Sequence, residues 1–171
     1  SLSTMNKVEL VEPFDGLKNS ISITGFYINE LIVRLLHKNE PHYELFSIYE
    51  ATLDDLKLCK NEQKILRRFE KELLQALGYG LVLDHDIENN LPINKEMGYY
   101  YSLEFGPSIR PPKQGEYIKL RGETLLALHN DCFNNSNTLN ESKKLMRYIL
   151  NYFLGSQPLI RRQLYKSYLN V

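Results

Sequence analysis

Apolar residues recur at helical spacing in three consecutive stretches near the start of this chain. In the first stretch they occupy the i, i+3, i+4, i+7 and i+8 positions of one buried helix face: Ile28, Leu31, Ile32, Leu35 and Leu36. The pattern predicts a helix that begins near Ser22 or Thr24 and stops before Pro41, then helices over residues 42–58 and 62–77. Connections this short favour antiparallel neighbours in a helical bundle.

The pattern changes over residues 81–119, where four prolines and three glycines exclude a long helix. Within this segment, residues 98–106 read as one aromatic-rich strand, half of a small hairpin. Helices are expected again over residues 122–130, 139–154 and 161–168, with Thr138 or Asn140 as the N-cap of the long one and Gly155 closing it. The predicted fold is mainly α, a helical bundle with a small irregular or β insert.

Composition adds little about function. The chain has 171 residues, of which 43% are hydrophobic and 25% charged, as is normal for a globular protein. Cys59 and Cys132 lie far apart in helix-like contexts, so two buried free thiols are expected, with a disulfide as the alternative. The net charge of zero conceals an uneven distribution, because residues 142–171 carry six bases and no acid. Such polarity indicates a local site for an anionic partner.

The strongest candidate for catalysis is the triplet Asp84, His85 and Asp86, an imidazole between two carboxylates. It could be a metal-ligand set or a general base with its orienting partner. However, adjacent loop residues point in different directions, and no second histidine lies at ligand spacing. A surface turn is the better interpretation, and no enzyme is expected.

Two basic groups are more informative. Lys64, Arg67, Arg68 and Lys71 lie at i, i+3, i+4 and i+7, so they share one face of a helix. A second group comprises Lys143, Lys144 and Arg147, with aromatic residues interleaved: Tyr148, Tyr152, Phe153, Tyr165 and Tyr168. Bases beside aromatic rings suit either single-stranded nucleic acid or an acidic peptide with an apolar end. The alternatives are a solvated charged face and, for Phe153, packing in the core.

Three ordered blocks carry a resemblance to a known family: residues 25–36 (GFYINELIVRLL), 66–80 (LRRFEKELLQALGYG) and 154–165 (LGSQPLIRRQLY). They resemble the helical part of the RecO family of bacterial recombination mediators, except that Ser156 replaces a glycine of the family pattern. The resemblance implies a non-enzymatic, cytoplasmic and nucleoid-associated protein of DNA repair. Such a protein binds single-stranded DNA, anneals strands, docks on the acidic, phenylalanine-ended tail of single-strand-binding protein (SSB), and acts with RecR to load RecA.

The resemblance also implies a domain division. Val8 and Leu10, followed by Pro13, read as a strand that resembles the last one of a truncated N-terminal OB-fold. Residues 1–15 are therefore expected to be its remnant and residues 16–171 the helical domain, the alternative being a strand docked on the helices of a complete protein. In many members of the RecO family the corresponding insert carries four cysteines that resemble a structural zinc site. Here residues 81–119 contain none, so we expect no zinc and no other cofactor, with tyrosine packing holding the insert.

The site expected for the SSB tail is the seam between the third helix and the final helices. Its members are Arg67, Arg68, Arg161, Arg162 and Lys166 as the basic rim, and Leu66, Leu159 and Tyr165 as pocket walls. The residues expected to contact DNA are Lys64, Lys71, Lys143, Lys144 and Arg147. Neither a membrane nor a small-molecule substrate is expected as a partner. The alternative function is a helical scaffold that binds an acidic protein partner and does not contact DNA.

Overall fold

The structure is a computed structural model that describes residues 19–36, 42–58 and 61–155. In chain order its elements are α1 (Asn19–Leu35), α2 (Tyr43–Lys57), α3 (Glu62–Ala76), β1 (Gly98–Ser102), β2 (Gly106–Ser108), β3 (Ile118–Arg121), α4 (Gly122–His129) and α5 (Ser136–Leu154). The described part is mainly helical with a small β insert, which confirms the predicted fold class. The expected strand near Val8 and the helix over residues 161–168 lie outside the described residues.

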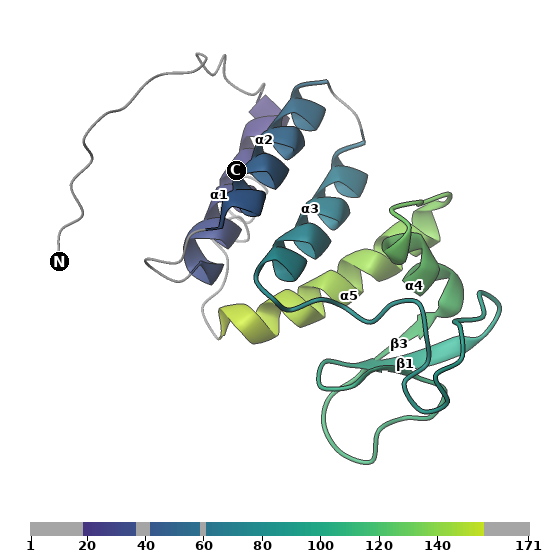
Figure 1. Ribbon diagram of the computed structural model, residues 1–171. Coiled ribbons are helices and arrows are strands. Elements are labelled where there is room, and N and C mark those ends of the chain that lie inside the picture. Colours follow the sequence, from purple (N-terminus) through teal and green to yellow (C-terminus); the bar gives the residue numbers. More distant parts are fainter. Residues whose placement is uncertain (1–18, 37–41, 59–60, 156–171) are drawn as a thin grey trace, which may run out of the picture.

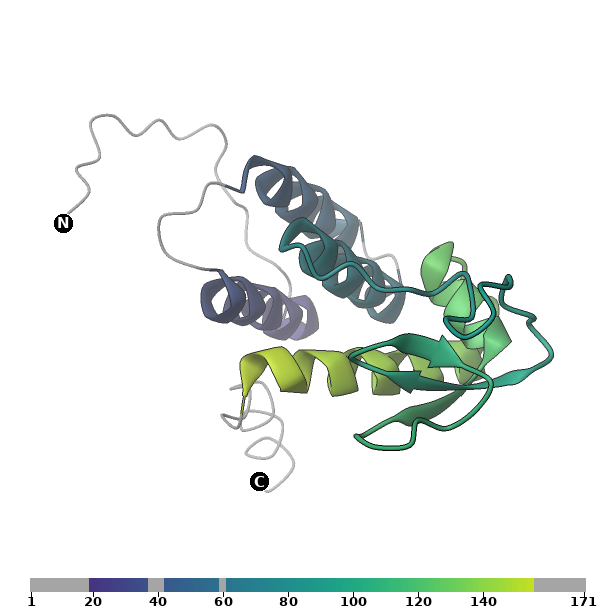
Figure 2. The same ribbon diagram turned by 60° about the horizontal axis from the view of Figure 1, so that its bottom comes forward.

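Helix α3 occupies the centre of the bundle. It packs against α1, α2 and α5, while α5 also contacts α1, α4 and the insert (Figure 1). In Figure 2, α5 runs from the end of the molecule next to α1 to the end that carries the sheet. The core residues of α3 include Phe69, Leu73 and Leu74, all fully buried, and they meet Leu145 and Ile149 of α5. The helical spacing read from the sequence therefore marks the faces that build the core.

The helix boundaries follow from caps. The Asn61 side chain accepts a hydrogen bond from the Lys64 amide at 3.2 Å, which starts α3, and Gly78 follows its end with a φ of +83°. At α5 the prediction of Thr138 or Asn140 as the N-cap is wrong. The Asn135 side chain accepts the Thr138 amide at 2.8 Å, so the helix begins at Ser136. Asn135, three residues before Thr138, thus satisfies one of the free amides at the start of α5, and the helix begins about one turn earlier than predicted.

The insert differs from the single strand expected over residues 98–106. β1 ends at Ser102, and it forms an antiparallel hairpin with β2, which begins only at Gly106; the sheet order is β2-β1-β3. The Ser102 hydroxyl accepts a hydrogen bond from the Phe105 amide at 3.3 Å, and Gly106 adopts a φ of +97°. A side-chain acceptor followed by a glycine with positive φ closes a tight turn. The strand prediction is therefore wrong at its second half.

Tyrosines hold this insert, as predicted. Tyr99 and Tyr101 are 2% and 3% exposed and lie on the sheet face that also buries Leu120. The Tyr99 hydroxyl accepts the Asn94 amide at 2.9 Å, and burial raises the pKa of Tyr101. Within the described ranges, no group of three or more histidine, cysteine, aspartate or glutamate residues is placed to hold a metal ion.

Two further findings concern the cysteines and the length and polarity of the helices. Cys132 is an exposed free thiol, so the prediction that it is buried is wrong, because it lies in the loop that follows α4. Cys59 lies outside the described residues. Among the helices of the described part, none is long and apolar enough to cross a membrane.

Gly122 begins α4 where the backbone of Asn94 approaches closely. A Cβ there would lie 2.0 Å from the Asn94 carbonyl oxygen and 3.0 Å from Ile93 Cγ2. Alanine is better than glycine in a helix by about 1 kcal/mol, but a backbone clash outweighs this gain. We expect Gly122→Ala to lower the free energy of unfolding by about 2 kcal/mol or more in urea titrations.

Gly80→Ala is the matched control. A Cβ at Gly80 would meet no atom within 4 Å, so this variant should unfold within about 0.5 kcal/mol of the parent. Equal stability of both variants would contradict the close approach of Asn94 to α4.

Candidate nucleic-acid interface

The basic residues of α3 do not form one exposed surface. Arg67 is only 6% exposed, and its Nη2 donates a hydrogen bond to Glu70 Oε1, which also accepts from the Tyr27 hydroxyl of α1 at 2.5 Å. Arg67 therefore belongs to a buried ion pair within α3, and the Tyr27 hydrogen bond ties this pair to α1. A guanidinium in that position cannot grip a carboxylate of a partner without first breaking this pair. Its expected place on the rim of a peptide site is therefore wrong.

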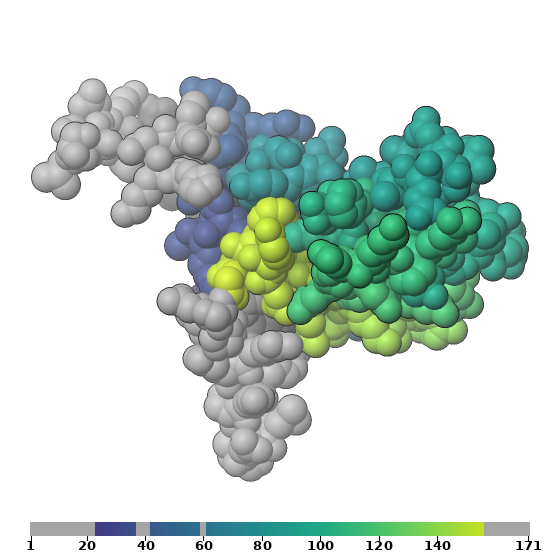
Figure 3. All heavy atoms as spheres, turned by 90° about the horizontal axis from the view of Figure 1, so that it is seen from below, coloured from purple at the N-terminus to yellow at the C-terminus, as the bar shows by residue number. Residues whose placement is uncertain are grey.

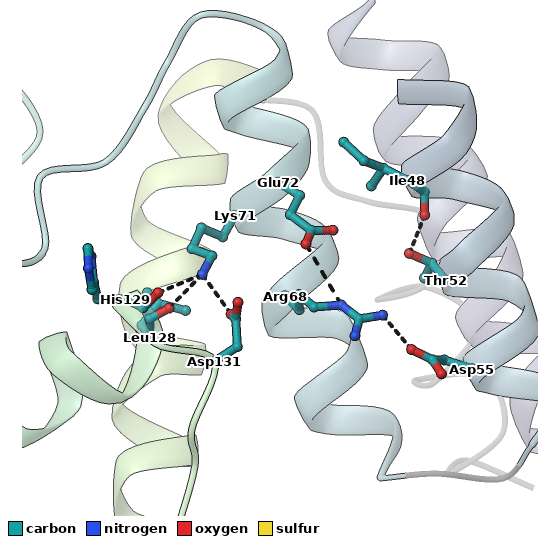
Figure 4. Close-up of polar contacts among 9 residues, drawn as sticks. All are labelled: Ile48, Thr52, Asp55, Arg68, Lys71, Glu72, Leu128, His129 and Asp131. Carbon is teal, nitrogen blue, oxygen red and sulfur yellow. Dashed lines mark hydrogen bonds and ion pairs between the residues drawn. The ribbon is translucent and has the colours of Figure 1, made fainter. Parts of the chain in front are cut away.

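Arg68 is turned to the other side of α3, toward α2 (Figure 4). Its Nη2 lies 2.5 Å from Asp55 Oδ2, and its Nε lies 3.9 Å from Glu72 Oε1. Burial raises the pKa of the Glu72 carboxyl, and the Arg68 guanidinium opposes this shift. Arg68 thus links α2 to α3 and keeps 33% of its side-chain surface exposed. Leu66 beside it belongs to the core at 5% exposure, not to an open pocket wall.

Lys71 has a structural role as well. Figure 4 shows its ammonium group among the carbonyls at the end of α4. Nζ donates to the carbonyl oxygens of Leu128 and His129, both at 3.0 Å, and lies 2.7 Å from Asp131 Oδ1. A cation there satisfies the last carbonyls of a helix and complements its dipole. The expectation that Lys71 faces solvent for DNA contact is wrong, which leaves Lys64 as the exposed base of this stripe.

The outer face of α5 is different. Lys143, Lys144 and Arg147 are all exposed, and Asn140 and Asn151 are exposed beside them. The later turns of α5 (yellow) come to the surface between α1 (purple) and the insert (green) in Figure 3.

The single acidic residue of α5, Glu141, is turned away from that face. Its Oε2 accepts from the Thr124 hydroxyl at 2.6 Å and the Arg121 amide at 3.3 Å. The exposed face of α5 is therefore basic and amide-rich without a neutralising carboxylate from its own helix. The exposed Lys144 and Arg147 can attract an anion more readily than the largely buried Arg67 and Lys71 of α3.

The aromatic residues near this face divide into two kinds. Phe153 is half-buried against the core and stacks on Tyr79 with ring centroids 4.3 Å apart, which confirms the expected packing role. The Tyr148 hydroxyl donates to the Glu116 backbone carbonyl at 2.8 Å, and burial raises the pKa of Tyr148. Tyr152 is 71% exposed and remains accessible to a ligand. Tyr165 and Tyr168 lie outside the described residues.

The rest of the expected peptide site also lies outside the described residues. This applies to Arg161, Arg162 and Lys166 and to the proposed walls Leu159 and Tyr165. Their arrangement with α3 remains a prediction.

The Asp84 triplet is not itself a surface turn: His85 forms an isolated β-bridge with Pro92, Asp86 is buried, and the turn follows over residues 87–89. His85 Nδ1 and Asp84 Oδ1 are 2.8 Å apart, and this contact lowers the pKa of the Asp84 carboxyl. Asp86 is 1% exposed, and its carboxylate accepts the amides of Glu88 and Asn89. The two carboxylates have separate partners and do not converge on the imidazole.

Comparison with known proteins is decisive for the family. The family model described as the C-terminal region of recombination protein O matches residues 21–162. The chain belongs to the RecO family. The described helices and the insert therefore correspond to the RecO C-terminal region.

Three relatives in the RecO family illustrate the similarity, and all are named DNA repair protein RecO. The protein of Nitrosospira multiformis is 40% identical over 168 residues, covering 98% of this chain and 69% of the relative. That of Nitrosococcus oceani is 39% identical over 163 residues, covering 95% and 66%. That of Alkalilimnicola ehrlichii is 43% identical over 154 residues, covering 89% and 60%. The chain thus spans about two thirds of the length of these relatives.

The sequence reasoning missed one exposed group of this RecO chain. Tyr100, Tyr117 and Lys119 meet on the outer face of the insert sheet. The alternation of side chains along a strand could have revealed this group: if Tyr99 and Tyr101 pack in the insert core, Tyr100 must point to the opposite face.

The pair inside the bundle gives a stability prediction. Glu70→Ala would leave the Arg67 guanidinium buried and unpaired, so the free energy of unfolding should fall by about 3–5 kcal/mol. Glu72→Ala is the control, because it removes a carboxylate from a pair that is one third exposed and should cost about 1 kcal/mol or less. Urea denaturation measures both. Equal losses would show that the Arg67–Glu70 pair does not stabilise the bundle.

Proposed function

We propose that this chain is the helical region of a DNA repair and recombination mediator that binds single-stranded DNA and promotes annealing of complementary strands. The observation that supports it best is the exposed face of α5, where Lys144 and Arg147 project into solvent beside the exposed Lys143. Membership of the RecO family and the names of its relatives point in the same direction. The proposal assigns the chain no catalytic step.

The chemistry of this face suits a nucleic-acid backbone. Lysine and arginine side chains displace counterions from phosphates, which gives affinity without sequence preference. Tyr152 lies two helical turns beyond Lys144 on the same row of α5 and is 71% exposed. An exposed ring beside cations can stack on a base of a single strand, whereas a paired base is covered by its neighbours.

Docking on the SSB tail is a further part of the proposal. A tail with several carboxylates and a terminal aromatic ring needs an apolar pocket rimmed by guanidinium groups. Since Arg67 and Leu66 are internal, Arg161, Arg162 and Lys166 become the main proposed rim, with Leu159 and Tyr165 as walls and Arg68 at the edge.

The remaining parts rest on family membership. They are joint action with RecR in loading RecA, and the assignment of residues 1–15 to the last strand of an OB-fold before a helical domain of residues 16–171.

Neutralising the α5 face should weaken DNA binding. We expect the double variant Lys144→Gln/Arg147→Gln to bind a labelled oligothymidylate more weakly and with a smaller salt dependence. The slope of log affinity against log salt should fall by about 1.4, because each lost single-strand phosphate contact removes about 0.7. Fluorescence anisotropy over a salt series gives both quantities.

The control removes the same charge elsewhere. Lys57 pairs with Asp54 at 3.0 Å and Lys95 with Glu96 at 3.7 Å, so both bases are already neutralised locally. Lys57→Gln/Lys95→Gln should leave the slope near that of the parent. Identical slopes for both double variants would remove the α5 face from DNA binding. A parent that binds no DNA but captures an acidic peptide would support a scaffold for a protein partner instead.

The peptide site has its own test. Charge reversal in Arg161→Glu/Arg162→Glu should weaken a labelled acidic, phenylalanine-ended peptide by about 1–3 kcal/mol, as expected for lost charge-assisted contacts. Arg110→Glu is the control, because Arg110 is an exposed arginine of the insert that is not among the proposed rim residues. Peptide anisotropy that is unchanged in the double variant would place the pocket elsewhere.

A further inference from the structure

The outer face of the insert sheet carries two tyrosines and a lysine in contact. Tyr100 of β1 lies opposite Lys119 of β3 in the strand register. The rings of Tyr100 and Tyr117 meet edge to face, with centroids 5.3 Å apart and an interplanar angle of 81°. Lys119 Nζ lies over the Tyr100 ring, 5.6 Å from its centroid. The opposite face buries Tyr99 and Tyr101, so the two faces differ completely in environment.

We propose that this outer face is a second contact site for single-stranded DNA, on which Tyr117 and Tyr100 stack with bases and Lys119 meets a phosphate. It rests on the proposed function and extends it from α5 to the insert. Tyr117 is 45% exposed, and its contact with Tyr100 restricts the orientation of its ring. A ring already held in place loses less conformational entropy when a base stacks on it.

The surrounding charge favours a nucleic acid. Residues 105–121 contain one acidic residue, Glu116, and four basic residues, Arg110, Lys113, Lys119 and Arg121. All four basic side chains are exposed. A cation close to an aromatic ring is the combination found where proteins follow a single-stranded backbone and stack its bases.

The strand that carries Lys119 also contacts α5. Arg121 Nε lies 3.5 Å from Glu141 Oε1 at one end of this segment, and the Glu116 carbonyl accepts from the Tyr148 hydroxyl at the other. Along the chain, Lys119 lies between the two contact points of the strand and Lys144 between those of the helix. The insert sheet and the α5 face are therefore neighbours, and one strand of DNA could reach both.

An exposed sheet face is better suited to stacking nucleobases than to holding the aromatic anchor of a peptide. Bases present flat π-faces, and exposed rings on a sheet can stack on any of them. The aromatic anchor of a peptide instead requires a well-packed pocket to be desolvated. Tyr117 is exposed and meets the half-buried Tyr100 edge to face on an open sheet surface, and DNA is therefore the proposed ligand.

Tryptophan replacement tests the site directly, because the chain contains no tryptophan. In Tyr117→Trp, the indole fluorescence reports that one position, and titration with oligothymidylate should quench it as bases stack. Tyr43→Trp is the matched control, since Tyr43 is 86% exposed at the start of α2, far from the sheet (Figure 1). Quenching confined to Tyr117→Trp supports the proposal, and equal signals in both variants would overturn it.

Affinity measurements complete the test. Tyr117→Ala should weaken oligothymidylate binding about fivefold or more, as expected for one lost stacking contact, while Tyr117→Phe keeps the ring and should stay within about twofold. Tyr43→Ala should bind like the parent. Thermal unfolding of each variant checks that the sheet is intact.

The outcomes separate this inference from the proposed function. If the parent binds DNA and Tyr117→Ala binds equally well, the insert site alone is wrong and the α5 face remains. If Tyr117→Ala only lowers the thermal midpoint, the tyrosine pair is a cross-strand stabilising contact. If the variant loses an acidic peptide and not DNA, the face is a protein site. A parent that binds no single-stranded DNA overturns both proposals.

Discussion

The polar residues of α3 hold the bundle together, and the rest of the structure depends on them. Glu70 accepts from Tyr27 of α1 and pairs with Arg67, Arg68 reaches Asp55 of α2, and Lys71 ends on the carbonyls of α4. Glu62 accepts the Thr24 hydroxyl of α1 as well. Apolar packing alone would permit α3 to slide or rotate among its neighbours, whereas paired polar groups satisfy one register only. We infer that these contacts select the arrangement of α1, α2 and α4 around α3.

This use of charge has a consequence for ligand binding. Three of the four bases on the α3 stripe have carboxylate or carbonyl partners within the protein. A ligand phosphate would have to compete with those partners, at the expense of the helix contacts. On α5 and the insert, Lys144, Arg147 and Lys119 are exposed, and the one carboxylate of α5 is occupied by Thr124 and Arg121. The division between structural and accessible cations is thus made by packing, and the formal charge of zero conceals it.

Sequence periodicity predicted the helices well and the site only in part. The expected helix over residues 62–77 is observed as Glu62–Ala76, because an apolar stripe, an asparagine cap and Gly78 all agree there. The same spacing placed Lys64, Arg67, Arg68 and Lys71 on one face, yet spacing cannot say which element covers a face. Glu70, the partner of Arg67, is buried where α1 supplies the Tyr27 hydroxyl, 43 residues away in the chain, and no local pattern contains that contact. The register of the hairpin was missed for a related reason: the turn after Ser102 depends on a hydroxyl and a glycine inside an aromatic run.

That aromatic run explains how one short sequence can serve both stability and recognition. Three consecutive tyrosines on a strand cannot all face the same side, because successive side chains alternate across the sheet. Tyr99 and Tyr101 fill the insert core, and Tyr100 is thereby placed outside, opposite Lys119. The packing that fills the insert core thus leaves an aromatic ring on the opposite face, and Tyr117 contacts that ring edge to face. The aromatic surface on which the proposed DNA contact rests therefore follows from how the insert is packed.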